Sequence, residues 1–352
     1  MDRRNGPGGH RFAFGSTLNL TAKSPGVDDR VPFLFASSGS TGYNDAQADD
    51  VRLSREYRTM PMSPEPLPSM AGKTCLVTGA TSGIGAVTAA ALAKAGATVI
   101  VVGRDPGRCR ATAESLRRLH GPSAAVPMVA DLSSMAEVRG LASEVRDRFP
   151  RIDVLLNNAG AMFDKRVESV DGIEKTWALN HLAPFLLTNL LLDTLKASAP
   201  ARVVVVASGA HRAVRGIDFD DPEAKVRRYK MIGAYAQSKL ANVMFSYELA
   251  RRLEGTGVAA NSLHPGFVAT SFFSGSRSLA FRLMSLAARL VAIGPEAGAR
   301  TSIHLAASSD VTGLSGRYFE KCRPVNSSPA SRDLESAARL WSLSESMTGL
   351  SV

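Results

Sequence analysis

A tyrosine and a lysine four residues apart, Tyr235 and Lys239 in the segment Tyr-Ala-Gln-Ser-Lys, are the residues of this chain best suited to proton transfer. Side chains at this spacing lie on the same face of a helix. A lysine ammonium placed there lowers the pKa of the phenol and makes it a usable proton donor or acceptor. The pair alone is weak evidence, because tyrosine and lysine meet at this spacing by chance on many solvent-exposed helices.

The lysine is needed because an ordinary tyrosine is too weak an acid. Its pKa is about 10, so half-ionisation near neutral pH requires a shift of roughly 3 units, or about 4 kcal/mol. One close cation in a shielded site supplies energy of that order. Taking a proton from an alcohol requires the phenolate, whereas giving a proton to a carbonyl oxygen requires only the neutral phenol.

A glycine-rich segment, residues 78–85, lies upstream of this pair. Gly79, Gly83 and Gly85 follow an apolar run and precede a helical pattern, which is the context that a dinucleotide-binding loop requires. Glycines there allow the backbone to approach a pyrophosphate, and the N-terminus of the helix offers free N–H groups and a positive dipole end. The segment therefore predicts a cofactor site upstream of the proton-transfer pair.

Short apolar runs alternate with longer helical patterns from Lys73 onward, and these elements must position the polar residues. The patterns Ile84–Ala95 and Ser134–Phe149 predict helices that end before Gly96 and Pro150. The alternation predicts an α/β fold with a single doubly wound parallel sheet, which binds ligands at the carboxyl ends of its strands. Six short and mostly unbroken apolar runs are typical of buried parallel strands: Thr74–Val77, Thr98–Val102, Val126–Ala130, Asp153–Leu156, Val203–Ala207 and Val258–Leu263.

A further helix is expected over Asn180–Leu195, with a kink at Pro184 near the polar residues. Asn180 opens this helix, and Ser208 follows the fifth apolar run. The chain thus places the glycine segment, Asn157-Asn158-Ala159-Gly160, Asn180, Ser208 and the Tyr235–Lys239 pair in one sequential order.

With these motifs in this order, the chain resembles the short-chain dehydrogenase/reductase family. The resemblance implies a Rossmann-type domain over residues 70–352 and a catalytic tetrad. In that tetrad Tyr235 exchanges the proton with the substrate oxygen, while Lys239 lowers its pKa and holds the nicotinamide ribose. Ser208 polarises the carbonyl as a hydrogen-bond donor, and Asn180 holds a water that links Lys239 to solvent.

The resemblance also implies the residues that bind the cofactor. Asp131 with Leu132 is expected at the adenine ring, the loop Pro265-Gly266 under the nicotinamide, and Thr270 at the carboxamide or pyrophosphate. The phosphates and the adenosine half would lie on the remaining residues, which are Gly79, Thr81, Ser82, Gly83, Ile84, Gly85, Asn158, Ala159 and Gly160.

The end of the second strand, Val102-Gly103-Arg104-Asp105, bears on the choice of cofactor. An NAD enzyme usually has an acid at this strand tip, where it bonds the ribose 2′-hydroxyl. Here Gly103 stands at that place, and the guanidinium of Arg104 can pair bidentately with a 2′-phosphate. The resemblance therefore favours NADP over NAD. In the alternative interpretation, Arg104 caps the strand and Asp105 bonds the ribose.

Within the family the chain is similar to the retinol-dehydrogenase-like subgroup. Ser208 and Tyr235 are 27 positions apart, and the added length is the polar stretch Ile217–Arg228, an insertion that the subgroup carries. Residues 238–242 and 316–320 also resemble the subgroup. His211, which closes the segment Ser-Gly-Ala-His, is interpreted as a structural neighbour of Ser208 and not as a proton carrier.

The segment after Gly266, where the family builds its substrate lid, is apolar. Such a lid implies a lipophilic alcohol or carbonyl substrate, such as a retinoid, a steroid or a long aldehyde. Arginines flank the apolar residues, so membrane-surface contact is an alternative to ordinary packing. The residues concerned are Phe267, Phe272, Phe273, the run Leu279–Val291, and Arg277, Arg282 and Arg289.

The first 69 residues differ in composition from the rest. They are rich in Gly, Ser, Asp and Pro, so we expect a disordered extension that is dispensable for activity. The net charge of +10 belongs wholly to residues 71–352, because residues 1–70 hold eight basic and eight acidic residues. This excess suits a phosphate-bearing cofactor, an anionic membrane surface or plain solvation. Nucleic acid is not expected, since Lys and Arg are scattered and not interleaved with aromatics.

Location and assembly are only loosely constrained by the sequence. Three distant cysteines, Cys75, Cys109 and Cys322, argue against a disulfide framework and for a reducing compartment, and none is placed as a metal ligand. No apolar stretch is long enough to span a bilayer. We expect a cytoplasmic monomer or homodimer, with organelle import or peripheral membrane association left open.

Two other functions compete with an NADP-dependent alcohol dehydrogenase or carbonyl reductase. One is a double-bond reductase resembling the protochlorophyllide enzyme, which shares the tyrosine and the lysine. The other is a redox sensor that binds NADPH without turnover. The complete tetrad argues against the sensor, because a sensor has no need of a proton relay.

Overall fold

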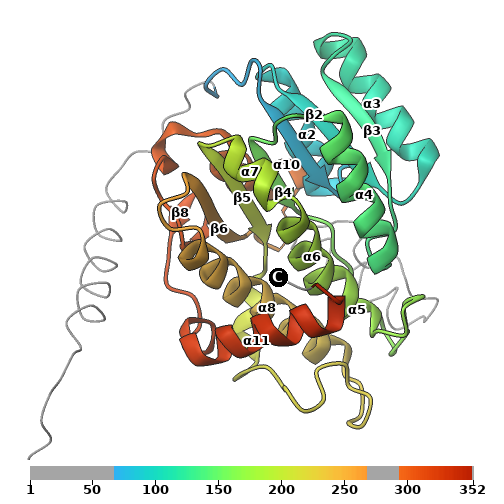
Figure 1. Cartoon of the computed structure of the whole chain (residues 1–352), viewed down its shortest axis with the longest axis vertical. Coiled ribbons are helices and arrows are strands. Elements are labelled where there is room, and N and C mark those ends of the chain that lie inside the picture. The colour runs from blue at the N-terminus through green and yellow to red at the C-terminus, as the bar shows by residue number, and fades with distance from the viewer. Residues whose placement is uncertain (1–66, 268–292, 351–352) are drawn as a thin grey trace, which may run out of the picture. The chain divides into compact units, whose positions relative to one another are not determined.

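The computed structural model describes residues 67–267 and 293–350. Residues 1–66, 268–292 and 351–352 lie outside this description and form the thin grey trace in Figure 1. Thr270 and the apolar run Leu279–Val291 lie outside the described residues, as does nearly all of the predicted extension, residues 1–69. The roles predicted for them stay predictions.

In the described part of the chain, eight strands form one sheet in the order β3-β2-β1-β4-β5-β6-β7-β8. Neighbouring strands from β3 to β7 run parallel, and β8 pairs antiparallel with β7 at one edge. The strands are β1 (Thr74–Thr78), β2 (Thr98–Gly103), β3 (Ala125–Val129), β4 (Val154–Asn157), β5 (Ala201–Val206), β6 (Val258–His264), β7 (Tyr318–Glu320) and β8 (Arg323–Pro324). The chain order reverses between β1 and β4, so their carboxyl ends open a crevice for ligands.

Helices cover both faces of this sheet, which confirms the predicted doubly wound α/β fold (Figure 1). The α-helices are α2 (Gly83–Lys94), α3 (Pro106–His120), α4 (Met135–Arg148), α5 (Lys175–Trp177), α6 (Ala183–Leu190), α7 (Leu192–Ala197), α8 (Met231–Arg252), α10 (Pro295–Ala307) and α11 (Leu334–Thr348). Shorter turns are η1 (Ala178–Leu182), η2 (Gly209–Ala213), η4 (Ser309–Val311) and η5 (Pro329–Arg332).

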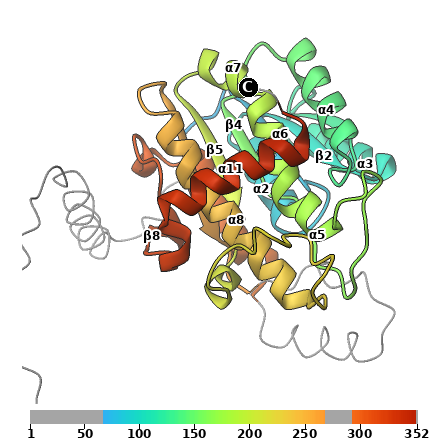
Figure 2. The same cartoon turned by 60° about the horizontal axis from the view of Figure 1, so that its bottom comes forward.

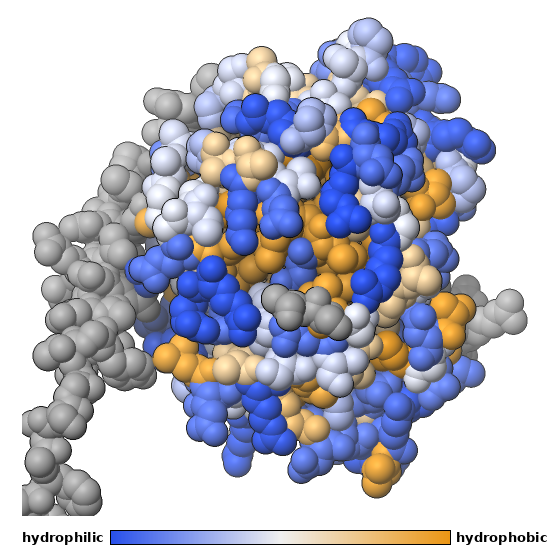
Figure 3. Space-filling model, in the orientation of Figure 1, coloured by the Kyte–Doolittle hydropathy of each residue, from blue (hydrophilic) through white to orange (hydrophobic). Residues whose placement is uncertain are grey.

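The strands are continuous apolar runs because each of their faces is buried in a separate core. Leu76 and Ile100 belong to the core shared with α4, α6, α8 and α11, whereas Val77 and Val99 belong to the core shared with α2, α3 and α10. Successive strand residues point to opposite faces, so both must be apolar. On the face drawn in Figure 3, polar side chains cover most of the surface, and apolar ones gather mainly near its centre.

All six strands predicted from the sequence form, with ends that differ from the expected ones by at most two residues. Strands β7 and β8 were not expected, since three and two residues are too short to give an apolar pattern. Among the described residues, no helix is long and apolar enough to cross a bilayer.

The single helix expected over Asn180–Leu195 is wrong. The chain makes a π-helical turn at η1, then α6, and breaks at Leu191 before α7. Pro184 has no N–H to donate to the carbonyl of Asn180, and the N–H of Ala183 bonds the carbonyl of Ala178, five residues back. The proline therefore widens the turn that contains Asn180 instead of kinking a continuous helix.

The last helix, α11, lies across α8 and α6 in both views of the molecule (Figures 1 and 2). Trp341 of α11 packs edge-on against Phe185 at a ring separation of 5.0 Å and contacts Phe245 at 5.9 Å. The guanidinium of Arg252 lies 4.0 Å above the Trp341 ring. This aromatic cluster fixes α6 against α8, the helix that carries Tyr235 and Lys239.

Candidate active site

The glycine segment forms a tight loop between β1 and α2. Gly79 has φ +65°, and a Cβ added at Gly85 would lie 2.3 Å from the carbonyl oxygen of Gly79. Ser82 is the N-cap of α2, but its side chain makes no capping hydrogen bond, and the first turn contains no acidic residue. The N-terminus of α2 is thus a cradle for an anion, and it fits the pyrophosphate of a dinucleotide.

A threonine and an asparagine lock this loop to the end of β4. The hydroxyl of Thr78 accepts hydrogen bonds from the backbone N–H of Asn158 at 2.9 Å and of Ala159 at 3.0 Å. The side-chain amide of Asn158 donates in return to the carbonyl of Thr78 at 2.8 Å. Asn158 and Ala159 therefore brace the cofactor loop through backbone contacts, a role that the sequence alone did not reveal.

The tip of β2 has no room for the acid of an NAD-type site. A Cβ at Gly103 would lie 2.9 Å from Cγ2 of Thr81 and 3.0 Å from Sγ of Cys109. The carboxylate of Asp105 caps α3 by accepting from the N–H of Arg108, so it is already engaged. This contact engages only Oδ1 of Asp105, so the interpretation in which Asp105 bonds the ribose stays open.

Two guanidinium groups lie near this strand tip. Arg104 is exposed, and its charge helps to lower the pKa of Asp131, on the loop after β3. Arg108, which sequence reasoning missed, donates to the carbonyl of Thr81 at 3.0 Å. Arg108 stands in the first turn of α3, where a cation faces the preceding loop, so its position in the sequence could have indicated this contact. The pair can hold a 2′-phosphate.

Asp131 is held as a carboxylate by its own loop. Burial alone would raise its pKa, but hydrogen bonds from the backbone and hydroxyl of Ser133 outweigh burial, and the charges of Lys175 and Arg104 add to them, so the pKa is lowered. The adjacent Leu132 is buried and packs in the core. An ionised Asp131 can accept a hydrogen bond from an adenine amino group, as the sequence predicts.

Lys239 reaches from α8 to the carboxyl end of β5. The side chain is 3% exposed, and its Nζ donates to the carbonyl of Val206 at 2.9 Å. The same nitrogen lies 5.7 Å from the centre of the Tyr235 ring. A Cβ at Gly160 would approach it to 3.5 Å, so the lysine borders the loop that follows β4. The tyrosine and the lysine thus lie beside the loop that follows β4.

Asn180 lies fully buried in the π-helical turn η1. Its side chain accepts from the N–H of Ala161 at 2.9 Å, donates to the carbonyl of Ala161 at 2.9 Å, and donates to the hydroxyl of Ser238 at 3.0 Å. A Cβ at Gly160 would lie 3.2 Å from its Oδ1. Asn180 therefore ties the loop after β4 to the residue that precedes Lys239.

Ser208 lies two residues after β5 and caps the turn η2, where its hydroxyl accepts from the N–H of Ala210. It also shares a side-chain hydrogen bond with Tyr235. His211 fixes the backbone here: its Nε2 accepts from the N–H of Ser328, so its Nδ1 carries the proton and donates to the carbonyl of Ser208. Both nitrogens are engaged, as expected for a structural neighbour.

Burial changes the acidities of both groups of the proton-transfer pair. Burial raises the pKa of Tyr235 to about 12, although its hydrogen bond with Ser208 acts in the opposite direction. Burial also lowers the pKa of Lys239 to about 8. Burial thus acts against both charged forms, and the lowering of the phenol pKa that Lys239 is predicted to cause stays a prediction.

The loop after β6 closes the site on its other side. Gly266 has φ +91°, and a Cβ there would lie 2.6 Å from the Cδ1 of Ile293. The next residue, Phe267, is 52% exposed and accepts a backbone hydrogen bond from Ile293. Pro265 and Gly266 thus stand at the carboxyl end of the sheet, where the nicotinamide loop was predicted.

Comparison with known proteins adds an independent line of evidence. Residues 73–219 match the family model described as short chain dehydrogenase. Retinol dehydrogenase 14 of Homo sapiens is 43% identical over 296 residues, which cover 80% of this chain and 88% of that protein. Retinol dehydrogenase 13 of Homo sapiens is 41% identical over 283 residues, with coverages of 79% and 85%. Among solved structures, the Pseudomonas aeruginosa RhlG/NADP active-site complex has a TM-score of 0.59, with 31% identity over 72% of this chain and 96% of that one.

Proposed function

The chain belongs to the short-chain dehydrogenase/reductase family as a retinol-dehydrogenase-like oxidoreductase, and from that premise we propose that it transfers a hydride between NADP and a lipophilic alcohol or carbonyl compound, with Tyr235 as acid and base. The observation that carries this proposal is the meeting of Tyr235, Ser208 and the buried Lys239 at the carboxyl end of β5. Lys239 borders the loop after β4 at Gly160, and Asn158 of that loop is bonded to Thr78 of the glycine segment, so the catalytic group and the cofactor loop share this neighbour.

The bound nicotinamide dinucleotide would supply or accept the hydride. In the reducing direction, Ser208 donates a hydrogen bond to the carbonyl oxygen and favours the charge that develops there. Tyr235, neutral at physiological pH because its pKa is about 12, donates its proton to that oxygen. The Lys239 ammonium, held by the carbonyl of Val206, stabilises the phenolate that remains.

The preference for NADP rests on the strand tip. Gly103 leaves no space for an acid, and Arg104 and Arg108 place two guanidinium groups beside Thr81 and Asp131. The name of the Pseudomonas aeruginosa complex, which includes NADP, supports the same choice.

The variant Arg104→Ala should raise the KM for NADPH by roughly tenfold and leave the KM for NADH within about twofold, because only NADPH carries the 2′-phosphate that the guanidinium pairs with. Steady-state kinetics with both cofactors measure this. Arg110→Ala, an exposed arginine on the same helix as Arg108, is the matched control. Equal effects on both cofactors would refute the assignment.

The variant Lys239→Met should be inactive and yet more stable than the wild type at pH 7. Burial lowers the pKa of Lys239 from 10.5 to about 8, so the unfolded chain binds this proton more tightly than the folded one. Burial of the charged Lys239 therefore destabilises the folded wild type fully below about pH 8. This destabilisation shrinks as the pH rises from about 8 to 10.5, and it is absent above 10.5. The advantage of the variant in urea unfolding should shrink over that window. A variant less stable than the wild type at pH 7 would contradict this reasoning.

The substrate class rests on the apolar segment after Gly266, where Phe267 is exposed, and on the retinol dehydrogenase names of the relatives. The test is a panel of all-trans-retinaldehyde, a long aliphatic aldehyde, a steroid ketone and glyceraldehyde with NADPH. We expect NADPH oxidation with one or more of the lipophilic compounds and far less with glyceraldehyde. Binding of NADPH without oxidation by any compound would favour the sensor instead.

A further inference from the structure

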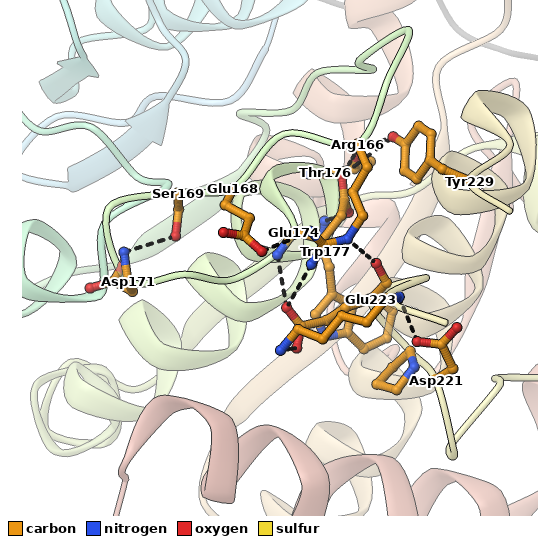
Figure 4. Close-up of polar contacts among 12 residues, drawn as sticks. Arg166, Glu168, Ser169, Asp171, Glu174, Thr176, Trp177, Asp221, Glu223 and Tyr229 are labelled. Atoms are coloured by element: carbon orange, nitrogen blue, oxygen red, sulfur yellow. Dashed lines mark hydrogen bonds and ion pairs between the residues drawn. The ribbon is translucent and has the colours of Figure 1, made fainter. Parts of the chain in front are cut away.

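A buried polar cluster joins the two segments that carry the catalytic residues. We call it the Glu174 junction and define it as Glu174, Thr176, Tyr229, Glu223 and Arg166, which point toward one another in Figure 4. These residues come from the loop after β4, from α5 and from the insertion before α8. None of them belongs to the tetrad.

Glu174 is 2% exposed and caps α5. Its carboxylate accepts from the backbone N–H of Thr176 at 2.9 Å and of Trp177 at 2.8 Å, and from the hydroxyl of Thr176 at 2.7 Å. A buried carboxylate is costly unless several donors satisfy it, so this residue is held in one position. Since α5 runs directly into η1, the capped turn sets where Asn180 lies.

Tyr229 lies in the segment just before α8 and contributes to the junction from that side. Its hydroxyl lies 3.0 Å from the hydroxyl of Thr176, 3.3 Å from the carboxylate of Glu174 and 3.2 Å from the carbonyl of Phe163. Burial raises the pKa of Tyr229 to about 12, so the hydroxyl keeps its proton and remains a donor. Phe163 follows closely after Ala161, both of whose backbone groups pair with Asn180.

The insertion reinforces the same link. The carboxylate of Glu223 accepts from the backbone N–H of Glu174 at 2.9 Å, and the guanidinium of Arg166 donates to the carbonyl of Glu223 at 3.0 Å. Gln237, two residues after Tyr235, donates to the carbonyl of Pro222 at 2.8 Å. The middle of the insertion is thus attached both to α5 and to α8.

The first turn of α8 depends on such support. Its N-cap, Lys230, makes no side-chain capping bond, and the turn contains no acidic residue. A helix that begins without a cap is less stable locally, and its first turn frays. Tyr235 stands one turn further along this helix, so fraying there displaces the phenol from Ser208.

We propose that Glu174 and Tyr229 are positioning residues that hold Asn180 and Tyr235 in register by joining α5 to the start of α8. This proposal rests on the proposed function only for its kinetic readout. Tyr229→Phe removes a single hydroxyl and should lower kcat about 10- to 100-fold while the Kd for NADPH changes by less than about twofold. Glu174→Gln, which turns an amide toward the N–H of Trp177, should act in the same direction but retain more activity than Glu174→Ala.

Two measurements separate positioning from mere stabilisation. The kinetics are run well below the unfolding temperature of each variant, where a purely structural role leaves kcat unchanged. Hydrogen exchange at the amides of residues 231–237 should accelerate in Tyr229→Phe, and this readout needs no turnover. Tyr247→Phe, on the same helix and bonded to Ser327, is the control expected to match the wild type.

The outcomes are distinguishable. Slower turnover together with faster exchange in the first turn of α8 supports the junction. Wild-type exchange in that turn, or unchanged kcat in both Tyr229→Phe and Glu174→Gln, overturns it. A wild type that reduces no carbonyl compound refutes the proposed function, and the exchange measurement then still decides whether the junction holds the helix.

Discussion

Tyr235→Phe should lower kcat for carbonyl reduction by about 10³-fold and leave the Kd for NADPH nearly unchanged. The phenol hydroxyl is the proton donor of the proposed reaction, and it is held by a hydrogen bond with Ser208. The ring itself stays, so its packing on α8 and its contact with Lys239 are kept. Stopped-flow or steady-state kinetics give kcat, and quenching of NADPH fluorescence gives the Kd.

The matched control is Tyr247→Phe, the same change on the same helix, about three turns away from the reacting group. Its hydroxyl bonds Ser327 and has no part in the proposed proton transfer. We expect its kcat to remain within about twofold of the wild type, since removal of one partly buried hydrogen bond costs only about 1 kcal/mol of stability. If Tyr235→Phe kept wild-type kcat, another group would have to supply the proton.

Gly85→Ala should weaken NADPH binding roughly tenfold or more and lower the melting temperature. The added Cβ would lie 2.3 Å from the carbonyl oxygen of Gly79 and 2.5 Å from the side-chain amide of Asn158. One neighbour is backbone and the other braces the end of β4, so neither can move without opening the cofactor loop. Titration with NADPH and thermal unfolding measure the two effects.

Gly140→Ala provides the control for this prediction. Gly140 also lies inside a helix, but an added Cβ there meets no atom within 4 Å. Alanine should stabilise α4 by about 0.5–1 kcal/mol and leave NADPH binding unchanged. Wild-type affinity in Gly85→Ala would mean that the loop does not approach the pyrophosphate as closely as proposed.

Local patterns made the fold and the cofactor loop predictable. Buried parallel strands are continuous apolar runs, and the spacing of Gly79, Gly83 and Gly85 between a strand and a helix is typical of a dinucleotide-binding loop. The doubly wound arrangement followed from the alternation of strands and helices, and the sheet confirms it. Tyr235 and Lys239 are neighbours on one helix, so their proximity also required no knowledge of the tertiary fold.

Features that depend on distant contacts could not be read from the chain. The carboxylate of Glu174 meets Tyr229 across 55 positions, and the guanidinium of Arg108 meets Thr81 across 27. The acidities of Tyr235 and Lys239 follow from burial, which no short motif encodes. The π-helical turn at Asn180 combines a local cause, Pro184, with packing that the proline does not specify.

Transfer of deuterium from [4,4-²H₂]NADPH, labelled at both C4 positions, to a lipophilic aldehyde tests the central claim most directly. The wild-type protein, incubated with the labelled cofactor and retinaldehyde or a long aliphatic aldehyde, should give an alcohol with one deuterium on the carbinol carbon. Mass spectrometry of the product measures this, and Tyr235→Phe should give almost none in the same time. Unlabelled alcohol, or no alcohol from any lipophilic aldehyde while NADPH binds normally, would contradict hydride transfer at this site.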